Sequence, residues 1–481
     1  MTALPALLLA LSCASEAPSA APVAEPSTEA PAPAEPSRRT AFVHGLPHVR
    51  QKPDFCGEAC LAMAMTGLGQ PTEQDAVFDL TGLDPALGRG AYARDLVIAA
   101  RALGFEPGQV FYPTEEADLA ARSAELDALI GDLARGVPSV VCMHFDASPD
   151  ASEHFRLVTG YDAETDELRY HDPALDHGAD LRMSRAKFLA LWPLRADDHT
   201  LTLIRLRLDP VALRAPPAAT GPTAADLAQA VMAARLMTAT SPGFTIRVSP
   251  PWVVVGDGKA ADVAWRAENT VKWTTTQLRR DFFPRDPDRV WTIWLFDTDA
   301  SYTDHSVAFF GNDPDTPYGY ADGDAAALVM NISTGGGTLV HEMVHPYVAA
   351  NLPDCPSWMN EGLASLYEHV GEEDGHIWGY TNWRLPGLKR GIKDGDLPSL
   401  RWLTSATPEQ FYGEEGGQNY AMSRYLMQYL QSKGLLRPFF ASYAKNRSTD
   451  PTGYQTLLDT LGVTDVPSFL ETWQRWALAL R

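Results

Sequence analysis

Cysteine is scarce in this chain, with five residues among 481. That is too few for a disulfide-rich scaffold, so hydrophobic cores must stabilise the fold. No apolar run reaches the length that a helix needs to cross a bilayer. Basic residues are outnumbered as well: 39 Lys and Arg against 61 Asp and Glu give a formal net charge of −22. A protein with that charge repels phosphate backbones, which argues against nucleic acid as a partner.

The chain does contain enough apolar sequence for more than one core. Hydrophobic residues make up 45% and charged residues 21%, the balance of a globular protein. A length of 481 residues fits two or three domains better than one. Residues 14–37 are almost all Ala, Pro, Glu and Ser, and residues 210–224 again favour Pro, Ala and Gly. We therefore predict folded domains at 41–209 and 225–481, joined by a linker at 210–224.

The N-terminus has the features of an export signal. Residues 3–12 are a short apolar stretch that ends at Cys13, and its length suits the core of a signal peptide. The small residue before Cys13 resembles the lipobox of bacterial lipoproteins, although no Lys or Arg precedes the stretch and Ala10 stands where Leu is usual. We interpret residues 1–13 as a signal and lipobox segment and 14–40 as a disordered tether. The expected location is the bacterial cell envelope, with a lipid anchor as the only membrane contact. The alternative is a leader with an incidental cysteine.

Hydrophobic periodicity predicts both helices and strands in each domain. The predicted helices include 56–66 and 224–237, and the predicted strands include 139–145, 155–161 and 291–296. From residue 338 onward the pattern is mostly helical. The predicted fold class is therefore α+β.

A His-Glu-Met-Val-His motif at residues 341–345 is the strongest chemical signal of the second half. Residues four apart share a face of a helix, so His341 and His345 can both point at one metal ion. Glu342 would then lie beside the metal-bound water, where it could take a proton. Glu361, in an Asn-Glu-Gly sequence sixteen residues after His345, supplies the third protein ligand that a catalytic zinc site needs.

This spacing resembles the gluzincin metallopeptidases, the thermolysin-like group, over residues 244–481. The resemblance implies a mostly helical zincin-type domain with a small mixed sheet. It also implies Zn²⁺ as the cofactor, with His341, His345 and Glu361 as ligands and Glu342 as the general base. The alternative is a helix whose two histidines make ordinary hydrogen bonds in a core.

Three more expectations come from the same resemblance. The strand at 326–331 would bind a peptide substrate by edge pairing. Tyr420 best resembles the residue that stabilises the oxyanion, and Tyr412 is second. The Asp that often lies four residues after the ligand Glu is Ser365 here, so support for a zinc histidine must come from elsewhere.

The first half contains a candidate thiol site. Cys56 follows a Pro-Asp pair that marks a helix start, and the positive end of a helix favours a thiolate. His154 begins a predicted strand and Asp172 ends the next one, so antiparallel pairing would bring the carboxylate to the imidazole. Gln51, five residues before Cys56, could donate a hydrogen bond to an oxyanion. His144 and His171 are rival bases.

The order Gln, Cys, His, Asp resembles the papain-like cysteine peptidases that process bacteriocin leaders at double-glycine sites, over residues 43–208. The resemblance implies a papain-like α+β domain with Cys56 as nucleophile, His154 as base, Asp172 as the group that orients the base, and Gln51 in the oxyanion hole. The sequence holds no segment that resembles the transmembrane or ATPase parts of those transporters, so leader processing is not expected. The alternative is a cysteine that only packs in a core.

Together these patterns predict an exported two-domain peptidase that acts on peptide or protein substrates. The zinc domain would hydrolyse peptide bonds and the first domain would use Cys-His-Asp chemistry. Two alternatives stay open: only the zinc domain is catalytic and the first domain binds peptides or cell-wall fragments, or the thiol domain is an amidase or acyl transferase. The patterns make no prediction about the oligomeric state.

Overall fold

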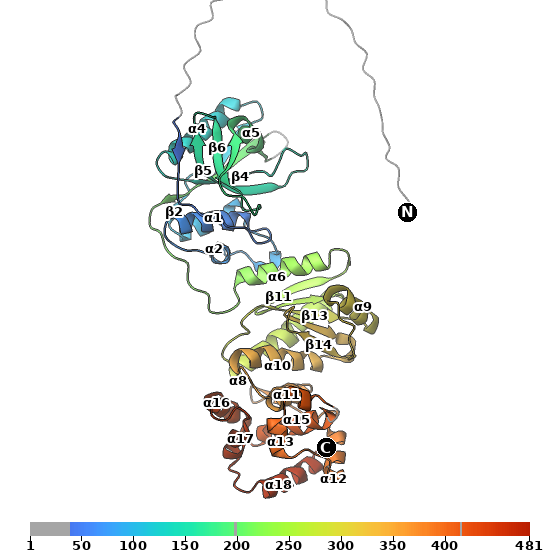
Figure 1. Cartoon of the computed structure of the whole chain (residues 1–481). Helices are drawn as coiled ribbons and strands as arrows, with labels where there is room; N and C mark the ends of the chain where they lie inside the picture. The colour runs from blue at the N-terminus through green and yellow to red at the C-terminus, as the bar shows by residue number, and fades with distance from the viewer. Residues whose placement is uncertain (1–38, 197–199, 414–415) are drawn as a thin grey trace, which may run out of the picture. The chain divides into compact units, whose positions relative to one another are not determined.

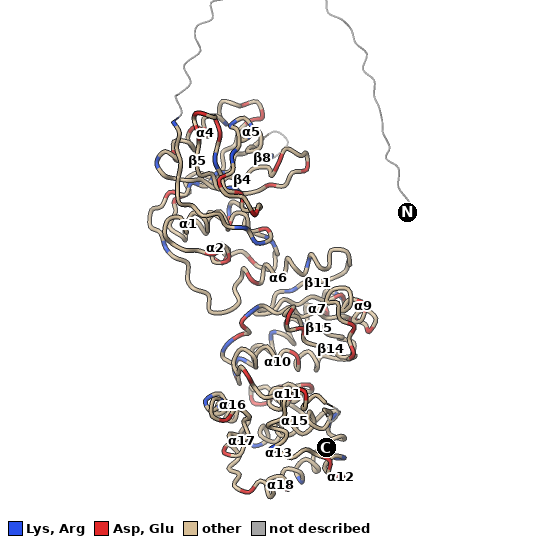
Figure 2. Tube along the Cα trace, viewed as in Figure 1, with Lys and Arg blue, Asp and Glu red and all other residues tan. Residues whose placement is uncertain are grey.

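The structure is a computed structural model that describes residues 39–196, 200–413 and 416–481 (Figure 1). The predicted signal and lipobox segment and nearly all of the predicted tether lie outside these residues. Among the helices that the structure describes, none combines the length and the apolar character that crossing a membrane requires. Acidic and basic residues are interspersed along both halves of the chain (Figure 2).

The first half is built around one antiparallel sheet with the strand order β3-β9-β4-β5-β6-β7, in which β1 also pairs with β5 and β8 with β9. The strands of the first half are β1 (Ala41–Phe42), β2 (Phe105–Glu106), β3 (Phe111–Glu115), β4 (Ser139–His144), β5 (Glu153–Asp162), β6 (Glu167–His171), β7 (Leu181–Ser184), β8 (Leu194–Arg195), β9 (Thr200–Arg207) and β10 (Asp209–Pro210). Of these, β2 and β10 form a separate two-stranded sheet. Its helices are α1 (Cys56–Gly67), α2 (Gln74–Thr81), the 3₁₀ turn η1 (Pro85–Leu87), α3 (Ala93–Ala102), α4 (Leu119–Leu133) and α5 (Arg185–Leu191).

Helix α1 and strand β5 form the centre of this domain. Residues 57–65 of α1 are all buried, because the sequence is apolar on nearly every face of the helix. Strand β5 is buried from His154 to Tyr161 and takes part in two hydrophobic clusters, one of which includes α1. This packing brings the start of α1, with Cys56, to the start of β5, with His154.

The chain stays attached to the first domain where the linker was predicted to begin. Strand β10 pairs with β2, and the backbone N–H of Arg214 donates to the carbonyl of Leu103 at 2.9 Å. Residues 209–214 therefore run along the first domain.

A five-stranded mixed sheet organises the second half, in the order β11-β12-β13-β15-β14. The strands are β11 (Thr245–Ser249), β12 (Trp252–Gly256), β13 (Trp291–Phe296), β14 (Gly319–Asp322) and β15 (Ala327–Asn331). Strands β12, β13 and β15 run parallel, and β11 and β14 are antiparallel to their neighbours. The prediction that strand 326–331 forms the substrate-binding edge is wrong. β15 lies between β13 and β14, and the short strand β14 occupies the edge.

The rest of the second half is mostly helical, and the predicted α+β class is confirmed. The helices are α6 (Ala224–Met237), α7 (Ala260–Arg266), the π-helix η2 (Ala267–Lys272), α8 (Trp273–Asp281), α9 (Asp299–Phe310), the 3₁₀ turn η3 (Ile332–Thr334), α10 (Gly337–Asn351), α11 (Ser357–Leu366), α12 (Leu385–Asp394), α13 (Leu400–Ser405), α14 (Pro408–Phe411), α15 (Gly416–Ser432), α16 (Leu436–Asn446), α17 (Tyr454–Leu461) and α18 (Val466–Ala479), with a hairpin of β16 (Val370–Glu373) and β17 (His376–Gly379). Helix α11 packs between α10 and α15.

Candidate active sites

Helix α10 presents both histidines of the HExxH motif on one face. Leu339, Val340, Met343 and Val344 are buried in the core, so packing sets the rotation of the helix. The imidazole rings of His341 and His345 lie one turn apart, with centroids 5.0 Å from each other.

Helix α11 brings Glu361 to these rings. Its Oε2 lies 3.3 Å from Nε2 of His341 and 4.0 Å from Nε2 of His345, and one ligand atom from each residue lies within 4.8 Å of the others. Oε2 is buried and makes no hydrogen bond with the described part of the chain. Two imidazole nitrogens and one carboxylate oxygen around a common point are the donors of a catalytic zinc site, so the residues present fit this metal.

Negative charge is concentrated around His341. Burial alone would lower the pKa of this imidazole, but Glu361, Glu368 and Glu342 outweigh burial and raise it. Burial raises the pKa of Glu361, yet the close imidazole of His341 and the charges of the two histidines lower it to about 2. Glu361 is therefore ionised at neutral pH, as a metal ligand must be.

Each candidate ligand is held by another side chain. Nδ1 of His345 lies 3.0 Å from Oδ1 of Asn360, and the hydroxyl of Tyr412 donates to Oε1 of Glu361 at 2.7 Å. These contacts leave the Nε2 atom of His345 and the Oε2 atom of Glu361 directed at the common point. Tyr412, the second candidate for the oxyanion, thus orients the carboxylate of Glu361.

Glu368 contacts the His341 imidazole, a role that the serine at position 365 does not fill. Its Oε1 lies 3.4 Å from Nδ1 of His341, whereas the Ser365 hydroxyl is buried without a hydrogen-bond partner among the described residues. Arg384 holds Glu368 with a fork, from Nη2 to Oε1 at 2.8 Å and from Nε to Oε2 at 3.0 Å. Burial raises the pKa of Glu368, but His341 and Arg384 lower it to about 2. Neither Glu368 nor Arg384 was predicted from the sequence.

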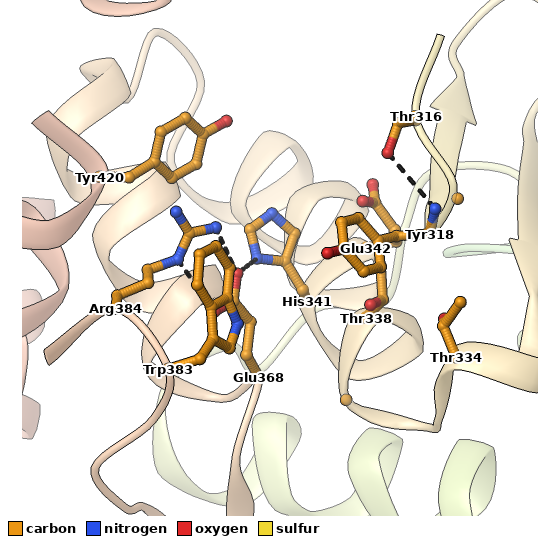
Figure 3. Close-up of a pocket in the computed structure, with 12 residues that line it drawn as sticks. Thr316, Tyr318, Thr334, Thr338, His341, Glu342, Glu368, Trp383, Arg384 and Tyr420 are labelled. Carbon is orange, nitrogen blue, oxygen red and sulfur yellow. Dashed lines mark hydrogen bonds and ion pairs between the residues drawn. The ribbon is translucent and has the colours of Figure 1, made fainter. Parts of the chain in front are cut away.

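A cleft of about 430 Å³ opens over His341 (Figure 3). Glu342 and Tyr420 line it on opposite sides of the imidazole, and the ring of Tyr420 lies under the Arg384 guanidinium at 4.7 Å. Tyr318 lies on the side of Glu342 (Figure 3), and Gly319, the first residue of β14, also lines the cleft. The structure therefore places both predicted catalytic residues and the true edge strand at one cleft.

In the first half, Cys56 is the first residue of α1, as predicted, and its thiol lies beside the backbone N–H of Phe155. Burial raises the pKa of the Cys56 thiol to about 12, against the lowering effect of the Phe155 and Gly57 backbone N–H groups. The helix start that was expected to favour a thiolate therefore also removes the sulfur from water.

The predicted His–Asp pair is present. Nε2 of His154 lies 2.8 Å from Oδ1 of Asp172, which leaves Nδ1 as the nitrogen that can accept a thiol proton. The edge of the imidazole packs against the ring of Phe145, with centroids 5.3 Å apart. Arg156 donates from Nε to Oδ2 of Asp172 at 2.8 Å. Burial raises the pKa of Asp172, but His154 and Arg156 lower it to about 2.

Sequence reasoning missed Arg156, although one signal was available. Between His154 and Tyr161 of β5 it is the one Asp, Glu, Lys or Arg, in a largely apolar stretch two positions after His154. Residues two apart point to the same face of a strand, so a charge there had to meet the same surroundings as His154.

Gln51 lies beside Asp172, whereas the rival base His171 is held by backbone groups. The backbone N–H of Gln51 donates to the carbonyl of Pro173 at 2.9 Å, which anchors it next to Asp172. Its side-chain Oε1 is buried without a partner in the described structure. Both ring nitrogens of His171 contact backbone groups, Leu46 O and Asp180 N, each at 3.0 Å. His171 is therefore a structural residue, and the geometry favours His154 as the base.

One comparison with protein families matches the first half of the chain. Residues 43–197 match the Peptidase_C39 like family. A solved structure, the peptidase domain of Streptococcus ComA, a bifunctional ABC transporter involved in a quorum-sensing pathway, is similar at 21% identity and a TM-score of 0.23. That match covers 34% of this chain and 96% of the other. The comparison with curated proteins found no match.

Proposed function

We propose that this chain is an exported two-domain peptidase, in which the second domain hydrolyses peptide bonds with zinc and the first domain uses a cysteine nucleophile. One observation carries the zinc assignment. The buried Oε2 of Glu361 has no hydrogen bond in the described structure and faces the Nε2 atoms of His341 and His345. A buried carboxylate oxygen without a partner is costly, and a divalent cation would remove that cost.

His341, His345 and Glu361 would hold the zinc, which supplies Lewis acidity toward a peptide carbonyl and toward water. Glu342 takes a proton from the attacking water and passes it to the leaving amine. The hydroxyl of Tyr420 donates to the oxygen that gains negative charge.

The exposed edge of β14 gives the substrate a place to bind. This strand borders the cleft through Tyr318 and Gly319 and is paired on one side, with β15. A peptide backbone can add to such an edge as another strand, so its carbonyl would lie over the cleft.

In the first domain, sulfur attacks the peptide carbonyl while Nδ1 of His154 takes the thiol proton from Cys56. The imidazole then protonates the leaving amine, and water clears the acyl-enzyme. Asp172 keeps the imidazole oriented, and the Gln51 amide donates to the oxyanion. The match of residues 43–197 to the Peptidase_C39 like family supports this assignment.

The proposed location is the bacterial cell envelope, with Cys13 as the lipid attachment point. Support comes from the short apolar stretch before that cysteine. Mass spectrometry of membrane-extracted protein, compared with a Cys13→Ala variant, tests it. Recovery of the full N-terminus without a lipid would refute the anchor.

The function is tested with Cys56→Ala and Glu342→Ala, alone and together, assayed on a peptide library beside metal analysis. We expect about one zinc ion per chain and two sets of cleaved peptides, each lost with one variant. Cys355→Ala and Glu268→Ala are matched controls outside both sites and should keep both activities. A zinc content far below stoichiometry, without recovery on adding zinc, would refute the metal assignment.

The raised pKa of the Cys56 thiol favours a second candidate, in which only the zinc domain is catalytic and the first domain binds peptides or cell-wall fragments. Under that candidate Cys56→Ala loses no cleavage of any substrate. Cleavage of cell-wall fragments but not of linear peptides would instead indicate an amidase or acyl transferase.

A further inference from the structure

A second depression, of about 490 Å³, adjoins the cleft over His341, because Gly337 and Glu368 line both. The other residues that line it come from α7, η2, α8, the start of α10 and the segment that leads into β16. They are Trp265, Arg266, Asn269, Thr270, Trp273, Gly336, Val340, His369, Val370 and Gly371. The proposed chemistry of the cleft makes no use of this depression.

Two tryptophans give the depression apolar walls. Trp265, near the end of α7, is 58% exposed, whereas Trp273 packs against the hydrophobic core of the second half. Nε1 of Trp273 donates to Oε2 of Glu372 at 3.3 Å, which fixes the indole. The π-helix η2 lies between the two tryptophans, and π-helical turns are rare and frequent at functional sites. An exposed indole near an ordered one offers a surface on which an apolar side chain can pack.

Arg266 brings a positive charge to this depression. Its side chain is partly buried and makes no ion pair or hydrogen bond with the part of the chain that the structure describes, and Asp262 and Asp297 act on it only at longer range. Its Nη1 lies against Gly336, where an added Cβ would be 3.1 Å away. A partly desolvated guanidinium without a counter-ion is costly, and an anion would remove that cost.

The carboxylates near Arg266 are engaged elsewhere. Both oxygens of Glu368 accept from Arg384, at 2.8 and 3.0 Å. Glu372, behind the second indole, accepts from Nε2 of Gln277 at 2.7 Å. Among the described residues that line the depression, Arg266 therefore carries the charge that is left without a partner.

We propose that this depression binds a peptide carboxylate, which pairs with Arg266 while the apolar side chain next to it packs on Trp265 and Trp273. Arginine presents parallel N–H donors that match the two oxygens of a carboxylate. Capture of a C-terminal carboxylate is a recurring mode of peptide recognition, and an acidic side chain carries the same group. The inference rests on the proposed function for its ligand class, because the depression would hold part of the substrate beside the cleft.

Isothermal titration calorimetry tests the proposal on the full chain with Cys56→Ala and Glu342→Ala, which prevent cleavage. The probes are acetylated Ala-Ala-Ala-Phe with a free C-terminal carboxylate, the same peptide as a C-terminal amide, and acetylated Ala-Ala-Glu-Phe amide. A carboxylate peptide should bind about tenfold or more tightly than the plain amide. Tight binding of the first or the third probe supports the site and identifies the source of the carboxylate. Equal affinity for all three overturns it.

Arg266→Met should remove the preference for a carboxylate and leave the affinity for the plain amide unchanged. Arg266→Gln removes the same charge and takes its place if Arg266→Met does not fold. Arg247→Met is the matched control, because this exposed arginine of β11 donates to the carbonyl of Ile246, at 3.1 Å, away from the depression. It should bind like the parent. A preference that persists in a folded Arg266 variant overturns the proposal.

The proposed zinc site is a competing place for a carboxylate, so the titrations are repeated in EDTA. A preference that persists in EDTA and depends on Arg266 supports the depression as the site. A preference that disappears with the metal assigns the carboxylate to the zinc and overturns the proposal. None of these readouts requires cleavage. A chain that holds no zinc and cleaves no peptide would therefore refute the proposed function without changing the result for Arg266.

Discussion

Oε1 of Glu368 lies 3.4 Å from Nδ1 of His341, although the two residues are 27 positions apart in the chain. Glu368 is seven residues after Glu361 and three after Ser365, the position where the gluzincin resemblance places an Asp. The carboxylate thus reaches His341, a proposed zinc ligand, from just after the end of α11, and Arg384 keeps it in place.

This contact predicts a loss of zinc affinity in Glu368→Gln. The amide keeps the shape of the side chain but removes the charge that orients and polarises His341, so affinity should fall by about 10- to 100-fold. Competition with a chromophoric chelator measures it. Glu373→Gln, on the exposed hairpin that follows, is the control. Unchanged affinity in Glu368→Gln would show that the contact does not support the metal.

Tyr412 and Tyr420 should have different roles at the proposed zinc site: Tyr412 in metal binding and Tyr420 in catalysis. Tyr412→Phe removes the hydroxyl that donates to Glu361, so zinc should dissociate faster. Tyr420→Phe leaves that bond intact and removes the proposed oxyanion donor, so kcat should fall by about 100-fold with zinc retained. Zinc content and kcat, measured on both variants, check the division. A fall in kcat for Tyr412→Phe alone, with normal zinc binding, would reverse the assignment.

Gly337, the first residue of α10, should not tolerate a side chain. A Cβ there would meet the backbone oxygen of Glu368 at 2.0 Å, so Gly337→Ala must displace that segment. We expect a lower melting temperature and weaker zinc binding. At Gly336 the added Cβ would meet only the tip of Arg266, at 3.1 Å, and Gly336→Ala should be nearly neutral. Equal effects of the two substitutions would contradict the close approach.

Glu58 should make the first domain less stable as the pH rises. Burial raises its pKa from 4.5 to about 8 in the folded chain. Between these two values the folded chain keeps a proton that the unfolded chain has released, so the free energy of unfolding decreases with increasing pH. Glu58→Gln removes this dependence and should stabilise the domain above pH 8, by up to a few kcal/mol.

Urea unfolding at several pH values, with a tryptophan signal of the first domain, measures the effect of Glu58. Glu73→Gln replaces an exposed carboxylate at the start of α2 and serves as the control. A parent stability that is flat between pH 5 and pH 8 would contradict the raised pKa.

The local sequence pattern was sufficient to predict several features of this protein. The predicted helix 224–237 and strand 291–296 have the observed bounds, because the Thr223 cap of the helix and the apolar run of the strand act within a few residues. The HExxH spacing placed two imidazoles on one helical face, and antiparallel succession of strands brought Asp172 to His154.

Tertiary packing alone decided the rest. That β14 and not β15 forms the sheet edge, that Glu368 contacts His341, and that burial raises the pKa of Cys56 all depend on contacts between segments distant in the sequence. Periodicity reports which face of an element is buried, but not which neighbour covers it. Desolvation and ion pairing depend on that neighbour, and so the charge state of each site was set only when the chain folded.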